Sequence, residues 1–271
     1  MILHTEQESA YSNLDLLSTE DILKAINQED QTVAIAVANC ITAIHSLVDN
    51  LVYKLARGGR LFYVGAGTSG RLGILDASEC PPTFGVDSEI IQGIIAGGDQ
   101  AIRNAVENAE DDMDDGWKTL THLQINSNDF LIGISASGTT PYVLSTLKYA
   151  RENGILTGCI VCNANSPIAK VSSYPIAIHT GAEFLTGSTR MKAGTAQKMV
   201  LNMISTAAMI RMGKVLGNKM VDMQLSNDKL RNRAVRILVE EAGCTSVKAR
   251  QLIEKHQKIR LAMEELKSEV K

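Results

Sequence analysis

Hydrophobic residues form five short, nearly uninterrupted runs in the first two thirds of the chain, at residues 60–64, 90–95, 130–134, 156–162 and 175–178. Runs of this kind, without polar alternation, are typical of strands buried on both faces, as in a parallel sheet. Helical patterns separate most of them, at residues 71–78, 101–109, 116–121 and 142–152. The alternation predicts an α/β fold: a doubly wound, parallel five-stranded sheet flanked by helices.

Further helical patterns lie on both sides of this region. A capping box at residues 18–21 predicts a short helix to about residue 27, and a long helix follows over residues 32–56. After the last strand we expect a helix over residues 192–212, with Gly217 and Asn218 marking its end. From about residue 226, charged helical segments predict a small bundle. We therefore expect two domains, residues 1–225 and residues 226–271.

Composition and charge narrow the class of protein. The 271 residues are 45% apolar and carry a formal net charge of −3, so a full core is possible and no basic field favours nucleic acid. No apolar run is long enough to span a bilayer, and the first residues lack the basic and apolar regions of a signal peptide. Five scattered cysteines fit a reducing compartment. We expect a cytoplasmic protein with no membrane or nucleic-acid partner.

No metal site is expected. Cys159 and Cys162 match the C-x-x-C pattern, but they fall in a predicted strand, where alternation points their side chains to opposite faces. The histidines have no metal-ligand spacing; they stand at positions 4, 45, 122, 179 and 256.

A glycine-rich segment, Gly65-x-Gly67-x-x-Gly70, follows the first strand and opens a helix. Glycines allow the backbone to turn tightly and to approach a ligand, and the N–H groups of a helix N-terminus point at an anion. A dinucleotide site also needs an acidic residue at the end of the second strand, where this chain has Gly97 and Gly98. A nucleoside triphosphate loop needs Lys and Ser or Thr after Gly70, where this chain has Arg71-Leu72.

A second loop, Ser135-Ala-Ser-Gly-Thr-Thr-Pro141, follows the third strand and opens another helix. Two hydroxyl-rich loops at strand ends can converge on one compact phosphate monoester. The alternative for each loop alone is an ordinary helix cap in a tight turn.

Two groups of carboxylates are candidates for proton transfer. Glu79 follows Asp76 by three residues, has apolar neighbours and stands just before Pro81-Pro82, where the helix should stop. A single glutamate in a helix is usually a solvated surface residue; burial of Glu79 would instead raise its pKa and let it act as a general acid. The second group is the acidic run at residues 107–115, within which spacing does not single out one member.

Residues 65–82, Gly-Ala-Gly-Thr-Ser-Gly-Arg-Leu-Gly-Ile-Leu-Asp-Ala-Ser-Glu-Cys-Pro-Pro, resemble the signature of bacterial N-acetylmuramic acid 6-phosphate etherases. Four further segments match the same family, at residues 95–98, 105–111, 135–142 and 185–198. The resemblance covers about residues 14–256. Glucokinase regulatory proteins are similar but lack the full set of motifs.

The resemblance implies a sugar-isomerase-type (SIS) phosphosugar domain that works as a homodimer without metal or nucleotide. It implies cleavage of the D-lactyl ether of N-acetylmuramic acid 6-phosphate, in cell-wall amino sugar recycling. The family's two functional glutamates fall on Glu79, as proton donor to lactate, and Glu110, as base. The resemblance also implies that the substrate phosphate is bound by Gly67, Thr68, Ser69, Ser135, Ser137, Gly138 and Thr139.

Several alternatives stay open. Arg190 and Lys192 are either counter-charges for the phosphate or members of surface or dimer contacts. The last helix matches the family poorly, so we expect a shortened, UBA-like C-terminal bundle. The same fold also serves sugar-phosphate isomerases, which need no leaving-group acid, and non-catalytic phosphosugar-binding regulators, which could lose Glu79. The presence of both glutamates favours the etherase.

Overall fold

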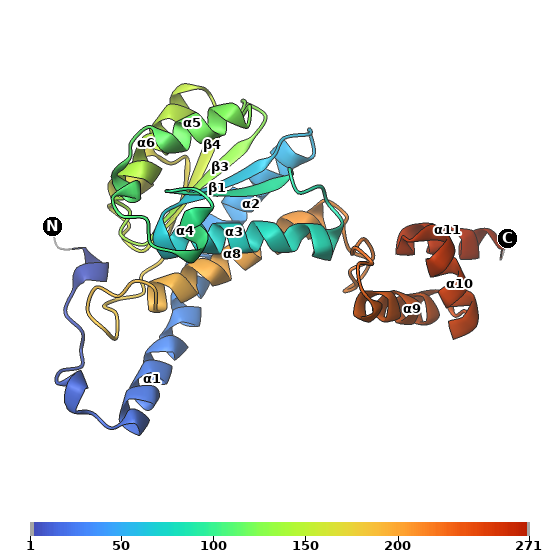
Figure 1. Cartoon of the computed structure of the whole chain (residues 1–271), viewed down its shortest axis with the longest axis horizontal. Coiled ribbons are helices and arrows are strands. Elements are labelled where there is room, and N and C mark those ends of the chain that lie inside the picture. The colour runs from blue at the N-terminus through green and yellow to red at the C-terminus, as the bar shows by residue number, and fades with distance from the viewer. Residues whose placement is uncertain (1–2, 270–271) are drawn as a thin grey trace. The chain divides into compact units, whose positions relative to one another are not determined.

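The computed structural model describes residues 3–269, and it divides the chain into two compact units. The first unit contains the residues up to Ala77 together with Glu89–Ala208. The second unit contains Ser78–Ser88 and the residues from Met209 onward. Figure 1 labels the elements of both units, and each unit is described by itself.

The first unit is built on a parallel sheet of five strands in the order β2-β1-β3-β4-β5. This confirms the predicted fold class, and every strand lies within one residue of the range that the hydrophobic runs predict. The central three strands are buried along almost their whole length, which explains their unbroken apolar sequence. The strands are β1 (Leu61–Gly65), β2 (Ile91–Ile95), β3 (Phe130–Ser135), β4 (Leu156–Val161) and β5 (Tyr174–Ala177).

Helices cover both faces of the sheet (Figure 1). One face carries α5 (Asp115–His122), α6 (Pro141–Glu152) and α7 (Pro167–Val171), whose apolar side chains form one core cluster with alternate residues of β1, β3 and β4. The other face carries α2 (Ile41–Leu55) and the start of α3 (Gly67–Phe84). Glycine makes both contacts close: a Cβ on Gly158 would lie 2.6 Å from Leu47, and one on Gly73 would lie 3.0 Å from Tyr63.

The N-terminal helices differ from the prediction of a short helix followed by a long one. α1 (Thr19–Ala38) is continuous through residues 28–31, and the break falls at Asn39 and Cys40, before α2. Residues 28–31 are polar but contain no glycine or proline, so they extend the helix. The predicted cap is confirmed, because Ser18 accepts a hydrogen bond from the N–H of Asp21 at 3.2 Å.

Within residues 3–269, no single helix is long and apolar enough to cross a membrane. α1 and α2 are long and apolar enough only when they are taken together, and the two helices are bent by 57° relative to each other.

The predicted stop of α3 at Pro81-Pro82 is wrong. The helix continues through both prolines to Phe84, and the N–H of Gly85 bonds to the carbonyl of Pro81 at 2.9 Å. Gly85 has a φ of +61°, so the residue that ends the helix is a glycine in the left-handed conformation.

Two other helix predictions also need correction, and one observed helix was not predicted. The pattern at residues 101–109 gives only α4 (Gln100–Arg103), followed by a 3₁₀ turn, η3 (Ala109–Asp111), that begins after Asn108 at a φ of +61°. α7 has no counterpart in the prediction because it is only one turn long. α8 (Lys192–Arg211) ends earlier than predicted, and Gly217 and Asn218 instead form the turn between Leu216 and Lys219.

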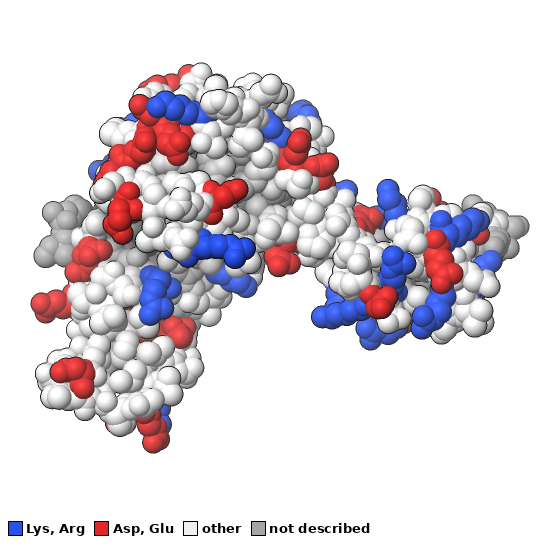
Figure 2. Space-filling view, in the orientation of Figure 1, with Lys and Arg blue, Asp and Glu red and all other residues white. Residues whose placement is uncertain are grey.

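Between residues 226 and 269 the second unit contains three helices, α9 (Asp228–Ala242), α10 (Ser246–His256) and α11 (Ile259–Glu269), with a core of their own. Asn227 caps α9, and Thr245 caps α10 by accepting from the N–H of Lys248 at 3.3 Å. Acidic and basic side chains are interspersed over the faces of both units drawn in Figure 2.

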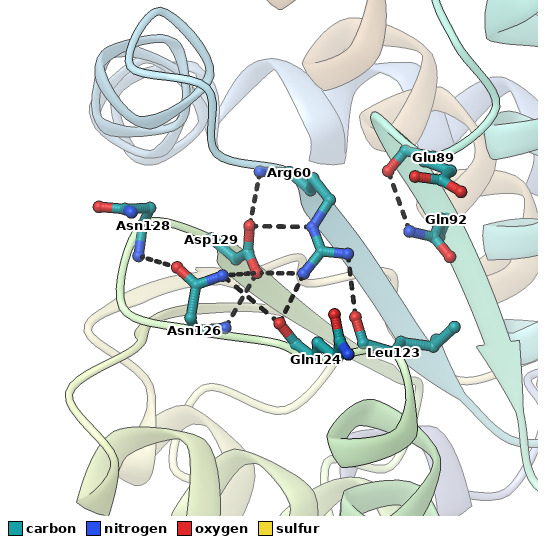
Figure 3. A network of polar contacts seen from close by, with 8 residues as sticks. All are labelled: Arg60, Glu89, Gln92, Leu123, Gln124, Asn126, Asn128 and Asp129. Atoms are coloured by element: carbon teal, nitrogen blue, oxygen red, sulfur yellow. Dashed lines mark hydrogen bonds and ion pairs between the residues drawn. The ribbon is translucent and has the colours of Figure 1, made fainter.

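An ion pair between Arg60 and the buried Asp129 lies at the end of the sheet where β1 and β3 begin (Figure 3). Asp129, just before β3, is 1% exposed and accepts hydrogen bonds from the backbone N–H of Arg60 at 2.8 Å and from its Nη2 at 2.8 Å. The same guanidinium donates to the carbonyls of Leu123 and Gln124, both at 2.9 Å. One arginine before β1 therefore organises the turn that leads into β3.

We expect Asp129→Ala to lower the free energy of unfolding by about 3 kcal/mol, because it leaves the Arg60 guanidinium without its carboxylate. Glu20→Ala is the matched control: it removes an exposed pair with Lys24 at 2.6 Å and should cost less than about 0.5 kcal/mol. Urea unfolding followed by circular dichroism measures both. Equal losses in the two variants would contradict the role of Asp129.

Candidate functional site

The order of the strands reverses at the carboxyl ends of β1 and β3. From β1 the chain moves outward to β2 at the edge and then returns to β3 on the other side of β1. α3 leaves β1 on one face of the sheet, and α6 leaves β3 on the other. Ligands of open α/β sheets bind at such a reversal of strand order. Because Gly65 pairs with Ile134, the two predicted loops begin side by side.

The first glycine-rich segment is more helical than predicted. α3 begins at Gly67, so Thr68 and Ser69 lie in its first turn, where N–H groups have no partner within the helix. Two close approaches require glycine: a Cβ on Gly70 would lie 2.8 Å from the carbonyl oxygen of Gly65 and 2.6 Å from Cγ1 of Ile95. These contacts press the helix N-terminus against the ends of β1 and β2.

The second loop is held by its own hydroxyl groups. Ser135, buried at the end of β3, accepts from the N–H of Gly138 at 3.1 Å and shares a hydrogen bond with Thr140 at 2.8 Å. Ser137 accepts from both the N–H and the hydroxyl of Thr139, at 3.2 and 2.9 Å. The predicted residues of this loop therefore lie together, with Thr139 exposed and Ser137 half-buried.

Gly138 fixes the shape of this loop. It has a φ of +73°, and a Cβ there would lie 2.2 Å from the hydroxyl oxygen of Ser166. Ser166 caps α7, whose Ile168 donates its N–H to the carbonyl of Gly138 at 3.1 Å. The loop is thus fixed to the start of the next helix.

The first two turns of α8 pack against the first turn of α3. Ser69 donates its hydroxyl hydrogen to Oε1 of Gln197 at 2.9 Å, and a Cβ on Gly194 would lie 3.5 Å from the methyl of Thr68. The buried carboxylate of Glu183 accepts from the N–H groups of Lys192 and Ala193, at 2.8 and 2.9 Å, and so caps α8. Sequence reasoning missed Gln197 and Glu183; the only signal for Gln197 was its place in the matching segment 185–198.

Lys192, a candidate counter-charge, is paired within the chain. Its side chain is 5% exposed, and its Nζ lies 2.5 Å from Oε2 of Glu29 on α1. Its charge is therefore neutralised by the N-terminal helix. Arg190 is exposed.

Glu79 is not buried in the single chain. Glu79 is exposed on α3, while Asp76 and Cys80, on the inward side of the same helix, are buried. Asp76 accepts hydrogen bonds from Tyr63 and Ser205, both at 3.0 Å. Burial raises the pKa of Asp76 to about 6, against the lowering effect of its hydrogen bonds. The buried carboxyl of this helix is therefore Asp76, inside the core of the first unit.

Glu110, the other candidate carboxylate, is exposed in η3 of the first unit, whereas Glu79 belongs to the second unit. Ala109 beside it lines a cavity of about 460 Å³ along β2, together with Gly97, Gly98 and Asp99. Asp112, in the same acidic run, has a structural role. It accepts hydrogen bonds from the N–H groups of Asp114 and Asp115, and these bonds lower its pKa.

The cysteines form no site in the described part of the chain. Cys159 lies in the core under α6, and Cys162 lies in a separate cluster with Ala136 and Ala193, so the C-x-x-C pair points to opposite sides as predicted. Both are free thiols, and burial raises the pKa of Cys159 to about 11. Across residues 3–269, no three His, Cys, Asp or Glu side chains are grouped to hold a metal ion.

The fold and the two loops define an SIS domain. Two family models match: the glucokinase regulatory protein N-terminal SIS domain over residues 39–151, and the SIS domain over residues 107–207. A putative phosphosugar isomerase from Bacteroides fragilis superimposes with a TM-score of 0.54 at 22% identity, over 71% of this chain and 92% of that one. A putative sugar-phosphate isomerase from Listeria monocytogenes gives 0.53 at 17% identity, over 73% and 93%.

Sequence relatives identify the family. A Christiangramia forsetii protein named N-acetylmuramic acid 6-phosphate etherase is 56% identical to this chain, over 98% of this chain and 97% of its own length. A protein of the same name from Porphyromonas gingivalis is 55% identical, over 97% of this chain and 96% of its own length. One from Geobacillus is 55% identical over 88% of this chain and 81% of its own. The chain belongs to the N-acetylmuramic acid 6-phosphate etherase family.

We expect Gly138→Ala to lower the free energy of unfolding by about 3 kcal/mol, because the new methyl adds a clash with Ser166 to the strain of a positive φ. Gly154→Ala is the matched control: Gly154 also has a φ of +73°, but nothing lies within 4 Å of its Cβ position. It should cost about 1 kcal/mol. Urea unfolding measures the difference, and equal losses would contradict the packing of Gly138 against Ser166.

Asp76 should make stability depend on pH. Its pKa is raised on folding from 3.8 to about 6, so the folded chain binds the proton more tightly than the unfolded chain. The stabilisation is complete below about pH 4 and is lost as pH rises through 6, with a total of about 3 kcal/mol at 1.36 kcal/mol per pKa unit.

Asp76→Asn removes this titration, so the difference in unfolding free energy between variant and wild type should shift in favour of the variant between pH 4 and 7. Urea unfolding at several pH values measures it. A constant difference over that range would contradict the assignment.

Proposed function

We propose that the protein is an N-acetylmuramic acid 6-phosphate etherase, a carbon–oxygen lyase that cleaves the D-lactyl ether of its substrate and releases N-acetylglucosamine 6-phosphate and D-lactate. The observation that carries the proposal is 54–56% identity to curated relatives of this name over nearly the whole chain. The two hydroxyl-rich loops, which begin side by side at the ends of β1 and β3, support it because they suit a compact phosphate monoester.

The phosphate would lie against the N-terminus of α3. The free N–H groups and partial positive charge of a helix start favour a dianion, and they are accompanied here by the hydroxyl groups of both loops. The residues that we assign to the phosphate are Gly67, Thr68, Ser69, Ser135, Ser137, Gly138 and Thr139. No step of the proposed reaction requires a metal ion or a nucleotide.

The reaction proposed is elimination followed by hydration. An ether oxygen at C3 is a poor leaving group in direct displacement, but in the open-chain sugar the C2 proton is acidified by the C1 aldehyde. A base removes that proton, lactate leaves from C3 with a proton on its oxygen, and water adds to C3 of the resulting enal. We assign the base to Glu110 and the proton donor to Glu79; each such group contributes roughly 10²–10⁴-fold.

A second subunit would account for the exposure of Glu79 and of several large apolar side chains. Proton donation by a carboxyl is favoured by removal from water, yet Glu79 is exposed in the single chain. Large apolar side chains are also exposed on α1, α2 and α3, with Leu23 at 61%, Ile35 at 67%, Tyr53 at 55% and Leu75 at 48%. We therefore propose a homodimer.

We also propose that residues 1–225 serve as the phosphosugar-binding domain and residues 226–271 as a small, UBA-like helical bundle. The place of action would be the cytoplasm, in the recycling of cell-wall amino sugars. The free, buried cysteines suit a reducing compartment.

Two other functions use the same fold. An aldose–ketose phosphate isomerase would keep the phosphate loops and a base but would have no use for a leaving-group acid. A phosphosugar-binding regulator would keep the loops without catalysis. Both glutamates stand in matching segments, at Glu79 and Glu110, and this favours the lyase.

Incubation of the protein with N-acetylmuramic acid 6-phosphate in heavy-oxygen water tests the reaction. We expect D-lactate without label and one heavy oxygen at C3 of the amino sugar, because water adds to the enal after the lactyl C–O3 bond breaks. Mass spectrometry of both products measures this. Absence of lactate release would overturn the etherase, and label in lactate would overturn the elimination route.

Glu79→Gln and Glu110→Gln should each lower kcat by roughly 10²–10⁴-fold, because the amide neither accepts nor gives the proton. Glu107→Gln is the matched control, since Glu107 is exposed in the same acidic run and has no assigned role. Lactate release under saturating substrate measures all three. Unchanged turnover in Glu79→Gln or Glu110→Gln would contradict the role of that residue.

A further inference from the structure

The side chains of Ser69 and Gln197 form a buried polar pair between α3 and α8. Gln197 is 1% exposed and Ser69 is 7% exposed, and the serine hydroxyl donates to Oε1 of the glutamine at 2.9 Å. The Nε2 group of Gln197 is buried and has no hydrogen-bond partner among the described residues. Buried amide donors are rarely left without an acceptor, so this side chain is incompletely satisfied.

The backbone of α8 holds Gln197 in place. Glu183 caps the helix, Lys192 pairs with Glu29 on α1, and Gly194 lies beside the methyl of Thr68. Movement of the glutamine is therefore confined to its own side chain, and rotation of the terminal amide exchanges Oε1 and Nε2 without displacing either helix.

A count of hydrogens shows what that rotation would change. A serine hydroxyl has one hydrogen to donate, and Ser69 donates it to Gln197. A phosphate dianion offers only acceptors, so Ser69 cannot donate to it while it donates to Oε1. If the amide turns, Nε2 donates to the serine oxygen, and the hydroxyl hydrogen becomes free for the phosphate. The turn gives Nε2 the serine oxygen as an acceptor and moves Oε1 to the buried position that Nε2 leaves.

We propose that Gln197 is a positioning residue that directs the hydroxyl of Ser69, and that its amide turns when a phosphate ester binds at the start of α3. The proposal rests on the proposed function in one respect, that Ser69 meets the substrate phosphate. Gln197 acts through Ser69 and does not touch the reacting atoms.

The test is the binding of N-acetylglucosamine 6-phosphate, measured by calorimetry between pH 6 and 8. In Gln197→Glu the carboxylate can only accept, so it keeps the Ser69 hydrogen and repels the phosphate. We expect roughly 10- to 100-fold weaker binding at pH 8. The deficit relative to wild type should shrink towards pH 6, because a buried carboxyl takes up a proton and can then donate to Ser69.

Gln197→Met, which neither donates nor accepts strongly, should weaken binding only about 3- to 10-fold and by the same factor at every pH. Ser205→Ala is the matched control on α8: it removes a buried hydrogen bond to Asp76 and should lower stability without changing the affinity. Removing Ser69 should abolish the effect of Gln197→Met, so Ser69→Ala and the double variant should bind equally.

Each result decides one question. Equal affinity of wild type and Gln197→Glu at pH 8, or a deficit that does not change with pH, overturns the proposal. Additive effects of Ser69→Ala and Gln197→Met also overturn it, even if Gln197→Glu does not fold. Failure of the wild type itself to bind the sugar phosphate overturns the proposed function instead, and the two failures are thereby distinguished.

Discussion

The parallel pairing of β1 with β3 is the constraint on which the candidate site depends. Gly65 lies opposite Ile134, so a glycine-rich turn and a serine-rich loop that are far apart in sequence begin at neighbouring positions. A shift of β3 by one residue relative to β1 would turn Ser135 to the opposite face of the sheet and would reduce the burial of the apolar residues of β3. The register is fixed by apolar packing on both faces and by Arg60 and Asp129 at the opposite edge.

The polar groups of the second loop are ordered before any ligand binds. Ser135, Ser137 and Thr139 are held by hydrogen bonds within their own loop, and Gln197 fixes the position of the Ser69 oxygen. Such groups lose little further conformational entropy when an anion arrives, because folding has already restricted them. The capped start of α8 serves the same purpose, since it keeps Gln197 against the first turn of α3.

The sequence predicted the sheet well because strands buried on both faces leave an unbroken apolar run. It failed where a local signal competes with the surroundings: Pro81 and Pro82 do not end α3, and residues 28–31 do not interrupt α1. The family motif located both loops, but the apolar neighbours of Glu79 did not decide its burial, and the structure exposes Glu79 and buries Asp76. The partners of Ser69 and Lys192 lie 128 and 163 residues away, and no local pattern encodes such distances.

The two candidate glutamates make different demands on their surroundings. A base that removes a C2 proton works as a carboxylate, so exposure of Glu110 to water is compatible with its proposed task. A donor that protonates departing lactate must hold a proton when the bond breaks, and that is favoured only where water is removed. Bound substrate covers one side of a carboxyl, and the proposed second subunit would cover another. With Glu79 as the proposed donor, its exposure in a single chain supports the proposed homodimer.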